Sequence, residues 1–130
     1  MANNYLQFST LLDVGSAENA RTALAWLDDE SNPVGFEFPY ERGFVATTEG
    51  CEAGAIFLYA EEYGDPDNLM LFARTCAVEF GLTGKWGFTW AETCSKPVPD
   101  EFGGGALVLD FETGRCTSAT LAAWLRDRLA

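Results

Sequence analysis

The densest group of chemically useful side chains lies between Trp86 and Ala106, where the chain reads WGFTWAETCSKPVPDEFGGGA. A carboxylate, a thiol and an amine follow one another there at Glu92, Cys94 and Lys96. A neighbouring ammonium group favours the thiolate, which is the nucleophilic form of cysteine, and exposed peptide N–H groups of glycines can meet an anion. The segment therefore predicts a candidate pocket. Its members are Trp86, Trp90, Glu92, Cys94, Lys96, Glu101, Gly103, Gly104 and Gly105.

The absence of histidine limits the chemistry of this segment. It excludes the serine–histidine–aspartate triad, the cysteine–histidine pair and histidine metal sites. Ser95 and Lys96 are adjacent, whereas serine acylases use the spacing S-x-x-K, and the three glycines match neither nucleotide-binding pattern. An enzyme would have to use Glu92 or Glu101 as its acid or base. The sequence favours a protein that is not an enzyme, with no cofactor and no metal.

The same segment also has a purely structural interpretation. In a strand, Trp86, Phe88 and Trp90 project to one face, and the small residues between them project to the other. Aromatic side chains at this spacing are typical of a strand whose crowded face is covered by a helix. The three glycines then allow a close backbone approach or a positive φ where the next strand begins. Both interpretations remain open at this point.

Residues 86–106 resemble a family of small uncharacterised prokaryotic and phage proteins. Members of that family share W-G-x-T-W-A-x-T-C-S-K-P followed by E-F-G-G-G-A, and the resemblance extends more weakly to the opening strand and to the acidic segment before the second helix. Family members often carry a basic residue where Val98 stands here, so we expect no phosphate or carboxylate site around that position. The resemblance implies no particular reaction.

The charge of the chain is strongly one-sided, with 20 Asp and Glu against 8 Lys and Arg and a net charge of −12. Such a charge repels nucleic acid and anionic membranes, so we expect no direct binding to either. It predicts a partner with a basic protein surface. The alternative is that the charge only keeps the surface solvated. The acidic patch expected to bind consists of Asp28, Asp29, Glu30, Glu61, Glu62, Asp65 and Asp67.

Regularly spaced carboxylates suggest a more specific hypothesis. Carboxylates two residues apart on a strand are about 6.7 Å apart, so a row of them can imitate a nucleic-acid backbone. We therefore predict a small acidic interaction protein, of the kind with which a phage or mobile element inhibits a CRISPR or restriction complex. The alternative function is a small ligand-binding domain or enzyme that uses the segment Trp86 to Gly105.

The location of the protein is predicted from its apolar segments and cysteines. No stretch is apolar enough for a membrane span, and the start MANNYLQFST lacks the features of a signal peptide. The four cysteines form no C-x-x-C pair and are expected as free thiols in the cytoplasm. They are Cys51, Cys76, Cys94 and Cys116.

The elements that must position these groups fit one domain over residues 1–130. Ser16, Asp65 with Pro66, and Thr117 or Ser118 are the expected starts of three helices, and Gly81 ends the second. Asp65 and Asp67 also begin like a calcium loop, but the loop glycine and the last glutamate are missing, so capping is the better explanation. The expected strands are 5–12, 35–40, 44–48, 55–62, 86–94 and 106–111.

This order predicts an α+β fold. We expect an antiparallel sheet of four to six strands with two to three helices. Its centre is a ferredoxin-like β-α-β-β-α-β core, to which a strand and a C-terminal helix are added. Two apolar stripes at helical spacing should face the core. They are Ala20, Leu24 and Leu27 in the first helix and Leu69, Phe72, Cys76 and Phe80 in the second.

Overall fold

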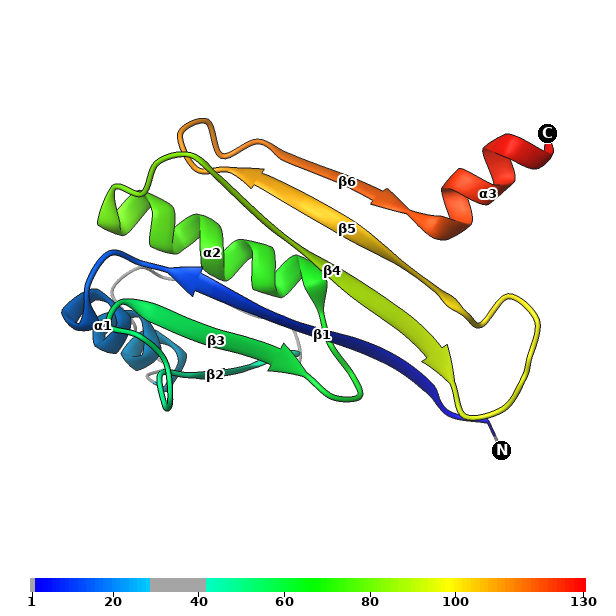
Figure 1. The fold of residues 1–130 in the computed structure, drawn as a ribbon, viewed down its shortest axis with the longest axis horizontal. Coiled ribbons are helices and arrows are strands. Elements are labelled where there is room, and N and C mark those ends of the chain that lie inside the picture. The colour runs from blue at the N-terminus through cyan, green and yellow to red at the C-terminus, as the bar shows by residue number, and fades with distance from the viewer. Residues whose placement is uncertain (1, 29–41) are drawn as a thin grey trace.

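The computed structural model describes residues 2–28 and 42–130 (Figure 1). One antiparallel sheet has the strand order β2-β3-β1-β4-β5-β6, and three helices accompany it. This confirms the predicted α+β class. The elements in chain order are β1 Asn4–Asp13, α1 Ala17–Asp28, β2 Val45–Thr47, β3 Ala55–Ala60, α2 Pro66–Phe80, β4 Lys85–Cys94, β5 Gly103–Asp110, β6 Cys116–Thr120 and α3 Leu121–Leu129.

The first four strands have the split arrangement of a ferredoxin-like core. Helix α1 connects β1 to β2 while β3 lies between these two strands, and α2 connects β3 to β4 while β1 lies between them. Each helical connection therefore crosses one strand of the sheet, as the β-α-β-β-α-β order predicts. Strands β5 and β6 extend the sheet beyond β4.

The predicted third helix start was wrong. Residues 116–120 form a strand that pairs with β5, and the cap of α3 is Thr120, whose hydroxyl accepts a hydrogen bond from the Ala123 N–H at 3.1 Å. A turn closed by the Gly114 N–H on the Asp110 carbonyl, with Gly114 at φ +73°, returns the chain along β5. Two strands are thus added to the core instead of one. The strand expected at 35–40 lies outside the described residues.

The other helix signals are confirmed. The Ser16 hydroxyl accepts from the Asn19 N–H at 3.0 Å before α1. Before α2, the Asp65 carboxylate accepts from the Asn68 N–H at 3.0 Å, and Pro66 begins the helix. Gly81 ends α2 in the left-handed conformation. Within the described residues, no helix is long and apolar enough to cross a membrane.

The core lies between α1, α2 and one face of the sheet. Alternate residues of the strands supply it, among them Leu12 and Leu58, while Leu69, Phe72 and Cys76 of α2 are fully buried against them. Trp26 of α1 stacks on Phe80 of α2 with ring centroids 5.3 Å apart, which joins the two helices. Both helices cover the same face, and within residues 2–28 and 42–130 the other face carries no helix (Figure 1). An antiparallel sheet tolerates one open face.

Burial raises the pKa of the Cys76 thiol from 9.0 to about 12, and a backbone hydrogen bond lowers it to a smaller extent. The thiol of the unfolded chain ionises first, so this group contributes its stability below pH 9 and loses it as the pH rises towards 12.

We predict that the free energy of unfolding of the wild type falls by about 1.4 kcal/mol per pH unit more steeply than that of Cys76→Ala in this window. Urea unfolding of both proteins at about pH 8 and about pH 11 measures it. The difference in unfolding free energy between the wild type and Cys76→Ala should therefore become smaller or vanish at the higher pH. An equal difference at the two pH values would contradict burial of this thiol.

Candidate functional site

The tryptophans of the predicted pocket serve mainly in packing. Trp86, Phe88 and Trp90 lie on the face of β4 that the helices cover, Phe88 is buried, and both tryptophans pack against the core. The pairing of β1 with β4 ends at Phe8 and Trp90. Beyond that point the Trp86 indole N–H donates to the Leu11 carbonyl at 2.9 Å. The indole ring of Trp86 thus provides a hydrogen-bond donor for a β1 carbonyl that β4 no longer pairs with. This agrees with the interpretation that the aromatic residues of β4 serve in packing.

The three glycines lie inside β5 and not in an open loop. Gly103, Gly104 and Gly105 pair with Glu92, Ala91 and Trp90 of β4. The Trp90 ring covers Gly105 and occupies the space that a Cβ atom would need there. Gly104 has φ +151°, and a Cβ atom at this residue would meet the Trp90 carbonyl oxygen. The glycines therefore allow two strands and an indole ring to come close together.

The remaining pocket members lie at the end of the β4–β5 hairpin. Cys94 is half-buried at the last position of β4, and Lys96 is exposed in the connection that follows. Ser95 fixes this end of β4 to the start of β1. Its hydroxyl accepts from the Asn3 N–H at 2.8 Å and its own N–H donates to the Asn3 carbonyl at 2.9 Å. All four cysteines are unpaired.

Acidic residues from three segments line one groove of about 420 Å³ at this end of the sheet. We call it the carboxylate groove. Its acidic members are Glu62, Glu92, Asp100 and Glu101, and its aromatic members are Tyr5, Tyr63 and Phe102. The groove unites one residue of the predicted acidic patch with three of the predicted pocket, because Gly103 lines it as well. In the described part of the chain, no Lys or Arg lines it.

Hydrogen bonds to β1 hold the wall that carries Glu62. The Leu6 N–H donates to the Glu62 carbonyl at 2.7 Å, and the Gly64 N–H donates to the Leu6 carbonyl at 2.9 Å. The Gln7 side-chain amide donates to the Glu61 carbonyl at 2.8 Å. A Cβ atom on Gly64 would lie 2.7 Å from the Phe8 ring, so only glycine allows this close approach.

The other acidic residues of the predicted patch lie elsewhere. Asp28 is the last residue of α1, and Asp29 and Glu30 lie outside the described residues. Asp65 caps α2, and Asp67 is exposed in its first turn. Among the described residues, no three His, Cys, Asp or Glu side chains are grouped closely enough to hold a metal ion.

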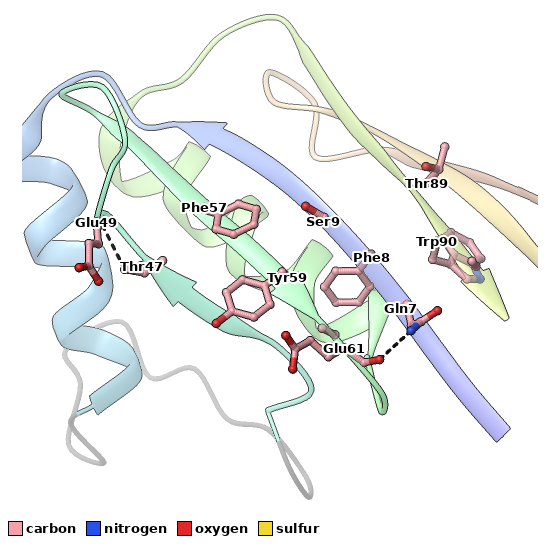
Figure 2. Close-up of a pocket in the computed structure, with 12 residues that line it drawn as sticks. Gln7, Phe8, Ser9, Thr47, Glu49, Phe57, Tyr59, Glu61, Thr89 and Trp90 are labelled. Carbon is pink, nitrogen blue, oxygen red and sulfur yellow. Dashed lines mark hydrogen bonds between the residues drawn. The ribbon is translucent and has the colours of Figure 1, made fainter. Parts of the chain in front are cut away.

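A second concave surface, on the open face of the sheet, was not predicted from the sequence (Figure 2). Its volume is about 870 Å³, and we call it the open-face depression. Phe57 and Tyr59 of β3 stack in it with centroids 4.9 Å apart and planes inclined by 25°. Glu49 and Glu61 lie on opposite sides of this ring pair in Figure 2. Small polar residues also line the depression, namely Gln7, Ser9, Thr47 and Thr89. The remaining lining residues are Phe8, Ala60, Trp90 and Ala91.

A sequence signal for this surface existed. In residues 55–60, Ile56 and Leu58 alternate with Phe57 and Tyr59, so the two pairs must project to opposite faces. Both pairs are apolar, and the pattern does not tell which face the helices cover. The structure buries Ile56 and Leu58 completely and leaves the aromatic pair half-buried on the open face.

No family model, curated protein or solved structure matches this chain. The resemblance over residues 86–106 therefore stays a prediction, and the chemistry of the two concave surfaces has to indicate the function. Aromatic faces attract cations, and the planar guanidinium of arginine both stacks on rings and pairs with carboxylates. The open-face depression combines these two elements, because Glu49 and Glu61 flank a stacked ring pair and no Lys or Arg among the described residues lines it.

The packing of Trp90 on Gly105 gives a testable difference between neighbouring glycines. We predict that Gly105→Ala destabilises the fold by about 1–3 kcal/mol, because the ring and the neighbouring backbone must move. Gly103→Ala is the matched control in the same strand, since the nearest atom to its Cβ is a Glu92 carboxylate oxygen at 3.8 Å. Urea unfolding of both variants measures the effect. Equal stabilities would contradict the packing described here.

Proposed function

We propose that this chain is an acidic interaction protein that binds a basic segment of a partner protein on the open face of its sheet. The observation that carries this proposal is the stacked pair Phe57–Tyr59, which lies between Glu49 and Glu61 and which no helix of the described part of the chain covers. The half-buried rings leave an aromatic surface accessible, and a partner's arginine or lysine gains both a ring face and a carboxylate there.

Long-range charge supports the same partner class. The net charge of −12 steers basic surfaces towards the protein and repels polyanions. Aromatic rings on a sheet could also stack with nucleobases, but neutralising a phosphate backbone needs Lys and Arg, and none lines the depression among the described residues. The surface therefore suits a cationic side chain better than a nucleic acid.

Neighbouring acidic residues line the two concave surfaces separately. Glu61 lines the open-face depression, and its neighbour Glu62 lines the carboxylate groove. A partner that normally holds nucleic acid presents a row of basic groups, and Glu49 and Glu61 of the open-face depression offer it two carboxylates. We therefore propose a nucleic-acid-binding protein as the partner, with a CRISPR or restriction complex as the candidate for a phage or mobile-element inhibitor. The four unpaired cysteines support a cytoplasmic location.

The carboxylate groove supports a second candidate function, the binding of a small cationic molecule. It unites Glu92 and Glu101 with Glu62 in a volume of about 420 Å³, which lies in the range of ligand pockets.

A polyamine is a suitable probe of this second function. We predict that Glu92→Gln lowers its affinity about fivefold, since one charge-assisted contact is lost, and isothermal titration measures it. Unchanged binding in this variant would rule out the groove as the site.

The main proposal predicts tight, salt-dependent binding of an arginine-rich peptide. We expect the pair Glu49→Gln and Glu61→Gln to weaken it about tenfold, because each change removes a carboxylate beside the stacked rings. Tyr59→Leu should weaken it by a smaller factor through loss of a ring face. Fluorescence anisotropy of a labelled peptide at about 0.05 M and about 0.5 M salt measures these changes.

The control is the pair Glu18→Gln and Glu79→Gln, which removes the same charge from the exposed surfaces of α1 and α2. It should leave the affinity within about twofold of the wild type, because screening limits the effect of distant surface charges. Equal weakening by both pairs would show that net charge alone attracts the peptide, and the open face would then lose its role.

A further inference from the structure

Helix α3 is an element whose apolar side chains the described chain does not cover. None of its residues is buried, and four large apolar side chains are more than half exposed. They are Leu121 at 60%, Trp124 at 57%, Leu125 at 52% and Leu129 at 77%. Figure 1 shows α3 extending from the end of β6, away from α1 and α2. A stripe at this spacing on a folded helix is typical of a face that packs against another protein surface.

Helix length adds a second argument. The helix has nine residues, and isolated helices of fewer than about 12 residues are marginal in water. Its Thr120 cap and its two arginines in the last turn stabilise it only modestly. Tertiary packing normally supplies the rest, and the described residues bury none of this helix.

The charge around α3 differs from that of the remaining chain. Helix α3 contains Arg126, Asp127 and Arg128 and so has a net charge of +1, whereas the whole chain has a net charge of −12. Two copies of a protein this acidic repel each other over most of their surfaces. Arg126 and Arg128 offset part of this repulsion at the last turn of α3, while Ala122 at the other end of the helix lines the carboxylate groove.

A groove beside α3 makes the surface self-complementary. It has a volume of about 510 Å³, and its walls are the Leu125 and Leu129 side of α3 and the Phe102 side of the β4–β5 connection. Asp100 and Arg126 both line it. A second copy brings both an apolar helix and its own arginines, so the arginines of each copy can approach the carboxylate of the other. A basic partner would meet these arginines, and an acidic one would meet the carboxylates of residues 100–101.

We propose that α3 is a self-association surface, on which the α3 helices of two copies pack around a two-fold axis. Each helix thereby buries the apolar stripe that its own chain leaves exposed. This inference does not depend on the proposed binding of a basic partner on the open face, because no residue of α3 lines the open-face depression. The groove beside α3 does share Asp100, Phe102 and Ala122 with the carboxylate groove. Added salt screens the repulsion between two acidic copies, so it should strengthen the dimer, whereas it should weaken the binding of a basic peptide.

Sedimentation of the full chain over about 1 to 500 μM protein tests the proposal. The mass should rise with concentration from 14.2 kDa towards twice that value, and the dissociation constant should fall at least about threefold between about 0.05 M and about 0.5 M salt. Leu125→Glu should raise the dissociation constant at least about tenfold, because it places a charge in the helix contact. Trp124→Ser should act in the same direction.

Val78→Glu is the matched control, since Val78 is 74% exposed on α2 and should have no effect. The α3 variants should keep cooperative urea unfolding, because α3 contributes no residue to the core. Ser118→Lys places a charge on the open edge of β6. A chain that stays monomeric over the whole range would overturn the proposal. So would a dimer that Ser118→Lys breaks and Leu125→Glu leaves intact.

Discussion

The packing of α1 and α2 on a single face of the sheet is the constraint on which the remaining structure depends. It divides every strand into a buried set and an exposed set, so that Leu58 enters the core while its neighbour Tyr59 projects into the open-face depression. Trp26 stacked on Phe80 keeps the two helices together on that face. Because a one-residue shift would exchange the two sets, the register between β1 and β3 determines both the stability of the core and the composition of the open face.

Much of the fold follows from local signals in the sequence. Asp65, Pro66 and Gly81 mark the limits of α2. Of the predicted apolar stripe, Leu69, Phe72 and Cys76 are fully buried and Phe80 is half-buried against the core. Local signals failed at β6, because Thr117 and Ser118 suit a helix cap as well as a strand. Residues 116–120 form a strand because the turn at Gly114 brings them alongside β5, with which they pair.

The candidate site was only partly predictable, for reasons of tertiary structure. The segment 86–106 was singled out correctly as dense, but its tryptophans are committed to the core and its glycines to close strand packing. Glu92 and Glu101 of this segment line a groove together with Glu62, which is distant in the sequence. Hydrogen bonds between β1 and residues 61–64 bring Glu62 to this groove, and the sequence does not show these bonds. The stacked pair Phe57–Tyr59 escaped prediction because an apolar alternation on both faces of a strand does not show which face the helices will cover.

The central claim is that the open face of the sheet receives a basic segment. A titration of the ¹⁵N-labelled protein with an arginine-rich peptide, followed through backbone amide signals, tests it most directly. The account predicts that the largest shifts fall on residues 7–9, 47–49, 57–61 and 89–91, which line the open-face depression. Shifts confined to α1, α2 or α3, or small shifts spread evenly over the acidic surface, would contradict it.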